Sequence, residues 1–213
     1  MSKLVDQTMV EFAESVAGKT PTPGGGSVSA LAGSLAGALG VMVGNLTIGR
    51  KKYQKLSEKE QQELDESYEQ LQRVRTQLME LVDKDKEAFD EVMVAVKMPK
   101  ETEGEQADRQ AALQKATKGA LEVPLETARA CLEVLKLLEA FARKGNPNAI
   151  TDLGVGALMA FAALEGALYN VEINLNDIEE DGYRQEVVTA VKQVWDAGKE
   201  QKDQITQLVK EKM

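Results

Sequence analysis

The feature that most constrains the fold of this chain is a segment without charged residues that runs from Ser27 to Gly49. Inside it, small residues recur at intervals of three or four positions, which places them along one face of a helix. A glycine inside a helix costs about 0.5–1 kcal/mol relative to alanine. The pattern therefore predicts that another helix packs closely here, and its members are Ser29, Gly33, Gly37, Gly40 and Gly44.

This segment is also long and apolar enough to suggest a membrane-spanning helix, and it contains the GxxxG spacing. Serine, asparagine and threonine interrupt it, and alanine and glycine supply much of the rest. Helices that are apolar all round also occur in the cores of large soluble proteins. We therefore predict a central helix of a soluble bundle, with no membrane as partner.

A loop with two prolines and three consecutive glycines, residues 20–26, precedes this helix. Serine is a favoured N-cap residue, so the helix is expected to start at Ser27, with free N–H groups that suit a carboxylate, a phosphate or a polar ring. A tight turn without a ligand is the alternative. The loop lacks the patterns of nucleotide-binding loops, and no apolar strand precedes it. The candidate substrate-binding residues are Pro23, Gly24, Gly25, Gly26 and Ser27.

Composition removes several classes of function. The chain has 213 residues, a formal net charge of −9, no histidine and one cysteine. The negative charge argues against nucleic acid as a partner. The lack of histidine excludes a Ser-His-Asp triad and a histidine-bound metal. We expect no disulfide, no metal, no tightly bound cofactor and a cytoplasmic location.

The rest of the chain shows helical periodicity separated by short polar breaks, and no strand pattern occurs. We predict an all-α bundle of about five to six helices in a single domain, residues 1–213. A second small-residue face on 149–175 predicts that this helix and 27–48 pack together at the centre of the bundle. The expected helices are 2–18, 27–48, 57–98, the segment from 104 to about 144, 149–175 and 181–212.

Asp85 interrupts an apolar series on the helix 57–98. Leu71, Leu78 and Val92 recur at heptad spacing, and Asp85 takes the missing position, so its side chain is expected on the apolar seam. An unpaired carboxylate buried there would lose several kcal/mol or take up a proton. Asp85 is therefore either part of a buried ion pair or an acid or base with a task. Asp83 falls on the opposite side of the helix.

Two residues on the helix that ends near residue 144 bear on the chemistry. Arg109 begins an otherwise apolar face, so it is a candidate partner for Asp85 or for a ligand carboxylate. Cys131 lies on an apolar stretch without an activating base, which favours a core residue over a nucleophile.

Cations and amides flank the two glycine–alanine helices. Arg50, Lys51 and Lys52 follow the first one, where they either complement the helix C-terminus or attract the anionic tail of a substrate. Asn146 lies in the loop 145–148 before the second helix and is a further candidate binding residue. Asp152 begins the small-residue face of that helix.

Three stretches in order carry a family resemblance: PTPGGGSVSALAGSLAGALGVMVGNLTIGRKKY, DKDKEAFDEVMVAVKMPK and TDLGVGALMAFAALEGALYNVEINL. Together they resemble the formiminotetrahydrofolate cyclodeaminase and methenyltetrahydrofolate cyclohydrolase family over most of the chain. The resemblance implies an all-helical homodimer with folate bound in a cleft near the subunit interface. We expect hydrolysis of methenyltetrahydrofolate to 10-formyltetrahydrofolate. The alternatives are cyclodeaminase activity that releases ammonia and a non-catalytic folate-binding or structural dimer.

The resemblance also implies roles for particular residues. It indicates that the PGGGS loop contacts the ligand and that Asp83, Asp85 and Asp152 lie near it. We expect Asp85 to act as general base or to stabilise the cationic one-carbon bridge, Asp152 to act as second acid, and Arg109 to orient one of them. The two lysines after the central helix would hold the glutamate tail of a folate, polyglutamylated forms included.

Overall fold

The computed structural model describes residues 3–213, and within that range it contains α-helices and short 3-10 turns but no β-strand. The predicted all-α class is therefore confirmed, and the six α-helices agree with the predicted number. They are α1 (Met9–Val16), α2 (Gly25–Asn45), α3 (Glu58–Val96), α4 (Glu103–Lys144), α5 (Ile150–Leu175) and α6 (Asp181–Lys212).

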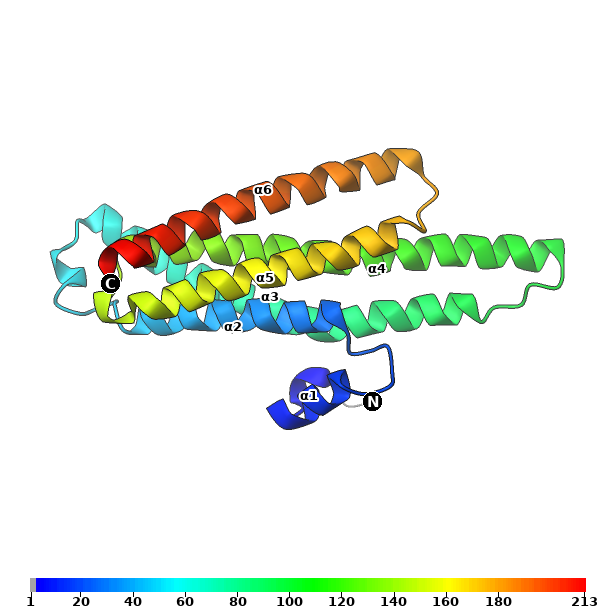
Figure 1. Ribbon diagram of the computed structural model, residues 1–213, viewed down its shortest axis with the longest axis horizontal. Coiled ribbons are helices and arrows are strands. Elements are labelled where there is room, and N and C mark those ends of the chain that lie inside the picture. The colour runs from blue at the N-terminus through cyan, green and yellow to red at the C-terminus, as the bar shows by residue number, and fades with distance from the viewer. Residues whose placement is uncertain (1–2) are drawn as a thin grey trace.

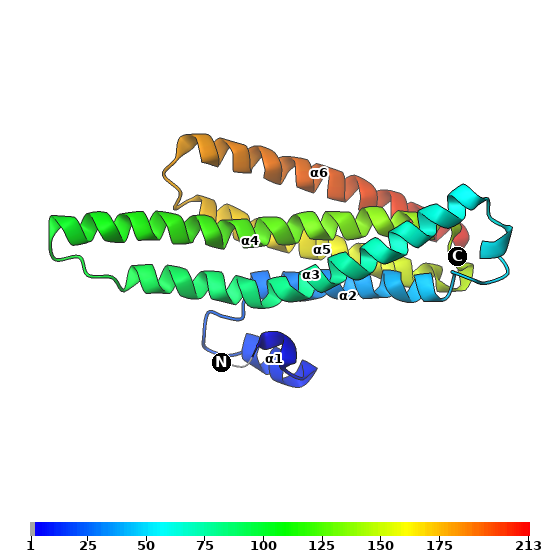
Figure 2. The ribbon, with the colours of Figure 1, turned by 180° about the vertical axis from the view of Figure 1, so that it is seen from behind.

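The glycine–alanine helices α2 and α5 form the centre of one side of an elongated bundle, as predicted. Figure 1 shows them toward the viewer, with α6 along one edge and α1 set apart beyond α2. Figure 2, from behind, shows α3 and α4 covering the opposite side. α2 and α5 run antiparallel, because Gly25 lies beside Asn170 whereas Gly156 lies beside Ala36.

The glycines of α2 serve a different contact from the one that the sequence suggested. We expected them to face the backbone of the second glycine–alanine helix, but they receive large side chains from α3 and α4. A Cβ placed on Gly40 would lie 2.5 Å from Leu138 Cδ2, and one on Gly44 would lie 2.4 Å from Tyr68 Cδ2. Removing the Cβ therefore makes room for the leucines and rings that fill the core.

Most of the expected helix boundaries agree with the structure, with two exceptions. The expected helix 2–18 is interrupted, since a 3-10 turn (Leu4–Asp6) precedes α1 and Thr8 forms a capping box with Glu11 that starts a new helix. Ser2 lies outside the described residues. α2 begins at Gly25 with Gly24 as N-cap, two residues before the expected start at Ser27.

Cys131 is fully buried in the core, and burial raises the pKa of its thiol to about 12. The thiolate is therefore scarce at neutral pH, and the core assignment of Cys131 holds over a nucleophilic one.

An apolar face covers the exposed side of α2 and α5. Eight large side chains on these helices and at the C-cap of α2 are 37–64% exposed, and on α2 three of them recur every seven residues, away from the glycines that contact α3 and α4. We call this set the apolar face: Val28, Leu35, Met42, Leu46, Val155, Leu158, Tyr169 and Ile173.

By length and composition alone, α2 and the segment Pro147–Leu175 would each be able to cross a membrane. About half of each apolar window is buried inside the bundle, at 56% and 50% respectively. Core helices of soluble proteins have the same length and composition. These properties therefore do not show what covers the apolar face.

Candidate functional site

Asp85 and the glycine loop meet at the N-terminus of α2. Asp85 Oδ2 accepts hydrogen bonds from the Ser27 backbone N–H at 2.8 Å and from the Ser27 hydroxyl at 2.9 Å. Residues that lie 58 positions apart are thus joined in one site, which we call the Asp85 corner (Gly24–Ser27, Asp85 and Asn170). Both pieces were predicted to be functional, and the fold brings them together.

Glycines are required at the Asp85 corner because side chains of α3 and α5 approach the backbone of α2 closely there. A Cβ placed on Gly26 would lie 1.9 Å from Asp85 Oδ1 and 2.5 Å from its Cγ, which no side chain tolerates. A Cβ on Gly25 would lie 3.2 Å from Asn170 Nδ2. Asn170 was not among the predicted site residues, although its position on the small-residue face of 149–175 was a signal that it points toward α2.

A side chain of the protein occupies part of the anion site that the sequence suggested at the start of α2. We expected the Ser27 side chain to cap the helix and leave its N–H groups to a ligand. Instead Ser27 is the third residue of α2, and Asp85 of α3 occupies the position of an N-terminal anion. The positive end of the helix favours this carboxylate in the same way that it would favour a ligand anion. Pro23 and Gly24 shape the turn that leads into it.

Two opposing effects set the acidity of Asp85. Burial raises the pKa of Asp85 above its ordinary value of 3.8, and the hydrogen bonds from Ser27 offset this only in part. The Ser27 hydroxyl also lies 2.9 Å from the carbonyl oxygen of Val82. Because a hydroxyl has one proton, it donates to ionised Asp85, or it donates to Val82 while protonated Asp85 donates to it. Asp85 can therefore be hydrogen-bonded to Ser27 in both protonation states.

Asp83, the acid next to Asp85 in the predicted site, contacts the N-terminal segment of the chain. Its Oδ1 accepts the backbone N–H of Leu4 at 2.6 Å, and this contact fixes the N-terminal 3-10 turn to α3. Asp83 lies on another side of α3 from Asp85, as the helical periodicity predicted.

Arg109 does not pair with Asp85, so that prediction was wrong. Its Nε donates to the carbonyl oxygen of Val96 at 3.3 Å, beside the turn between α3 and α4. Val96 is eleven residues beyond Asp85 on α3, or about 16 Å along the axis. Because α3 and α4 are antiparallel, the early position of Arg109 on α4 places it at the C-terminal end of α3. The partner of Asp85 is Ser27 instead.

Asp152 lies at the opposite end of α5 from the Asp85 corner. Asn170 marks the corner on α5, and eighteen residues separate it from Asp152, about 27 Å along the axis. Asp152 is in the first turn of α5, where its charge complements the helix dipole. Within one chain these two predicted acids are therefore not neighbours.

Lys51, Lys52 and Asn146 do come together, but at the end of the bundle that carries Asp152. They line a cavity of about 390 Å³, the basic pocket, with Arg50 and Lys144 among its other walls. From Ser27 to Leu46, the length of α2 separates this pocket from the Asp85 corner by about 28 Å.

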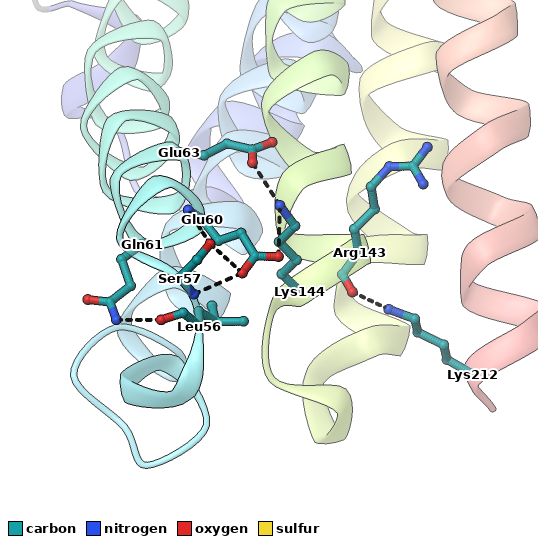
Figure 3. A network of polar contacts seen from close by, with 8 residues as sticks. All are labelled: Leu56, Ser57, Glu60, Gln61, Glu63, Arg143, Lys144 and Lys212. Carbon is teal, nitrogen blue, oxygen red and sulfur yellow. Dashed lines mark hydrogen bonds and ion pairs between the residues drawn. The ribbon is translucent and has the colours of Figure 1, made fainter.

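Not every polar group in the basic pocket is free for a ligand. Figure 3 shows Lys144 directed at Glu60 and Glu63, with N–O distances of 3.5 and 2.8 Å. The Asn146 side chain accepts from the Asn148 N–H and donates to the Leu46 carbonyl oxygen, so it ties the loop to the end of α2. The cations that remain are Arg50, Lys51 and Lys52. Among residues 3–213 no cluster of three or more histidine, cysteine or acidic side chains is arranged to hold a metal ion.

The fold and the corner together define a class of protein: an all-α bundle in which a partly buried carboxylate closes a glycine turn at the start of the central helix. Comparison with known proteins identifies the family within this class. The family model described as formiminotransferase-cyclodeaminase matches residues 8–193. The chain belongs to this family, which confirms the resemblance noted in its sequence.

Individual relatives agree with this assignment. A methenyltetrahydrofolate cyclohydrolase from Methylorubrum extorquens is 41% identical over 85% of each chain. The formimidoyltransferase-cyclodeaminase of Gallus gallus is 36% identical over 92% of this chain, which spans only 36% of that longer protein. The crystal structure of formiminotetrahydrofolate cyclodeaminase from Thermotoga maritima is 31% identical, with a TM-score of 0.84 and 96% of each chain covered.

Proposed function

We propose that this protein is a methenyltetrahydrofolate cyclohydrolase, which converts methenyltetrahydrofolate and water to 10-formyltetrahydrofolate. The observation that carries the proposal is the partly buried Asp85 carboxylate, whose Oδ2 is held by Ser27 while its Oδ1 lies over Gly26 without a Cβ in the way. The cyclohydrolase relative supports this reaction, since it matches over 85% of its own length rather than as part of a larger chain.

The chemistry suits a site without histidine or metal ligands. The one-carbon bridge of methenyltetrahydrofolate is a delocalised cation, so water adds to its carbon directly. Asp85 Oδ1 stabilises the cation and takes a proton from the attacking water, and Ser27 keeps Oδ2 in place. The carbon then has a C–O bond, and cleavage of its bond to N5 with protonation of that nitrogen leaves the formyl group on N10.

A second candidate is formiminotetrahydrofolate cyclodeaminase activity. There the folate nitrogen attacks the formimino carbon and ammonia leaves, through a similar tetrahedral species. The likeness to the Thermotoga protein favours this candidate. Non-catalytic folate binding is the remaining alternative.

Turnover assays separate these candidates. We expect the purified protein to remove the near-ultraviolet absorbance of methenyltetrahydrofolate at a rate proportional to enzyme concentration. Ammonia release from formiminotetrahydrofolate is the companion assay. Binding of both compounds without turnover of either would contradict an enzymatic function.

We further propose that the protein is a cytoplasmic homodimer, without attachment to a membrane, in which the apolar face of one copy covers that of another. Eight partly exposed large side chains on two adjacent helices form an unusually apolar surface for a soluble monomer. A two-fold axis through the middle of this face, near Leu35, would bring the end of the partner that carries Asp152 and the basic pocket beside the Asp85 corner. Asp152 would contribute to catalysis only through such a contact.

Replacement of Leu35 by glutamate tests the dimer. In detergent-free buffer we expect wild-type protein at twice the 23.2 kDa of one chain by light scattering. Leu35→Glu is expected to be largely monomeric and to lose at least about tenfold in turnover, because a charge cannot be buried unpaired in the interface. Val94→Glu is the matched control, since Val94 is 69% exposed on α3 away from the apolar face. A fully active wild-type monomer would exclude the dimer model.

A further inference from the structure

Arg75 carries a buried hydrogen-bond donor that nothing in the described chain satisfies. It lies on α3, and its Nε is buried without an acceptor. None of the ion pairs between residues 3 and 213 includes its guanidinium. A buried charged donor without an acceptor destabilises a fold. An acceptor from outside the chain would satisfy it.

Packing against the middle of α2 holds Arg75 in place. A Cβ placed on Gly37 would lie 3.2 Å from Arg75 Cβ, so α2 and α3 are close together there. The Ser34 hydroxyl donates to the Arg75 carbonyl oxygen at 3.1 Å. The backbone around Arg75 is thus fixed by neutral contacts, and no acidic side chain of the described residues forms an ion pair with its guanidinium.

The position of Arg75 relative to Asp85 indicates which anion the guanidinium binds. The two residues are ten positions apart on α3, about 15 Å along the axis, and both contact α2. Their contact points on α2, Ser34 and Ser27, are two helical turns apart, about 10 Å. In a folate, the aminobenzoyl group separates the pteridine from the glutamate carboxylates by a comparable length.

We propose that Arg75 binds a carboxylate of the substrate's first glutamate while the pteridine end lies at the Asp85 corner. Arginine presents two parallel N–H donors that match a carboxylate. Arg75 is on this view a specificity-determining residue that does not touch the reacting atoms. The inference rests on the proposed folate function and adds a named receptor for the glutamate. The basic pocket then serves the additional glutamates of longer tails.

A pair of substrates tests this assignment. We compare methenyltetrahydrofolate with methenyltetrahydropteroate, which lacks only the glutamate, on wild type, Arg75→Gln, Arg75→Lys and the control Arg73→Gln. Arg73 is an exposed arginine on the same helix. Wild type is expected to lose about 10- to 100-fold in kcat/KM when the glutamate is absent. Arg75→Gln should lose a similar factor on the folate, mainly through KM, and little on the pteroate. Arg75→Lys should recover part of the loss, whereas Arg73→Gln should resemble wild type.

Other outcomes would overturn the proposal. An equal loss on both substrates, with a lower dimer content, would mean that Arg75 pairs with a carboxylate of the second subunit. A glutamate-dependent loss in Lys51→Gln/Lys52→Gln but not in Arg75→Gln would assign the first glutamate to the basic pocket. If wild type turned over neither substrate, the proposed function would fail. The same comparison by calorimetric Kd would then decide whether Arg75 still recognises the glutamate.

Discussion

Asp85→Asn is expected to lower kcat on methenyltetrahydrofolate by about 10²–10⁴-fold, the range typical for loss of a general base. The amide matches the carboxylate in shape, and its oxygen, placed where Oδ2 lies, can still accept both the Ser27 N–H and the Ser27 hydroxyl. The fold is therefore retained while the proton acceptor is lost. Near-wild-type turnover by a folded Asp85→Asn protein would remove Asp85 from the mechanism.

The same variant makes a test of stability against pH. The raised pKa of Asp85 means that the folded state holds this proton more tightly than the unfolded state does. Its contribution to stability is therefore fully present below the ordinary value of 3.8 and is lost as pH rises through the folded-state pKa. We expect Asp85→Asn to have a higher Tm than wild type at pH 7, with the difference shrinking in acid.

A matched control for both measurements is Asp90→Asn, the same chemical change five residues further along α3. Asp90 is exposed and paired with Lys86, so its loss should change stability by no more than about 0.5 kcal/mol.

In wild type, kcat/KM should rise with pH through the raised pKa of Asp85, because only the ionised form accepts the proton. The control should retain this pH profile.

Gly26→Ala is expected to abolish most activity, by at least about 100-fold. Its Cβ would fall within 1.9–2.8 Å of all three atoms of the Asp85 carboxyl group, and the long helix α3 prevents a simple retreat. The carboxylate would have to leave Ser27, and we expect a loss of about 1–3 kcal/mol in the free energy of unfolding. Denaturant unfolding and turnover measure the two effects.

Two comparisons isolate the cause of the Gly26→Ala effect. Gly119 lies inside α4 with nothing within 4 Å of a Cβ, so Gly119→Ala should stabilise the protein by about 0.5–1 kcal/mol. In an Asp85→Ala background the clash is absent, so Gly26→Ala should cost much less stability than in wild type. Equal costs in the two backgrounds would show that helix propensity or the turn, and not the Asp85 contact, requires glycine at position 26.

Much of the helical framework was predictable, since it depends on local signals. Ser57 and Thr102 each form a capping box at the start of a long helix, and the polar break around Pro99 separates the two helices. The N-terminal segment was harder, because the capping box at Thr8 divides a pattern that looks like one amphipathic helix. Asp85 was recognisable as a candidate because a carboxylate at an apolar heptad position needs a partner.

The partners of the site residues did not follow from such signals. Ser27 rather than Arg109 pairs with Asp85, because the antiparallel contact of α3 and α4 places Arg109 beside Val96, past Asp85 at the C-terminal end of α3. Asn170 and Arg75 were missed for the same reason: the periodicity of one helix does not show which residues of a neighbouring helix lie beside a given residue.

The order of residues alone was enough to predict the all-α class, the two glycine–alanine helices and the position of Asp85 on an apolar seam. It was also enough to exclude catalysis by histidine. These properties depend on composition and on periodicity within one helix. Only the packing of helices decided that the PGGGS turn closes on Asp85 while Asp152 and the basic pocket lie at the other end. Long-range pairing depends on how side chains from distant segments fill one core, and a pattern read along one segment carries no information about that choice.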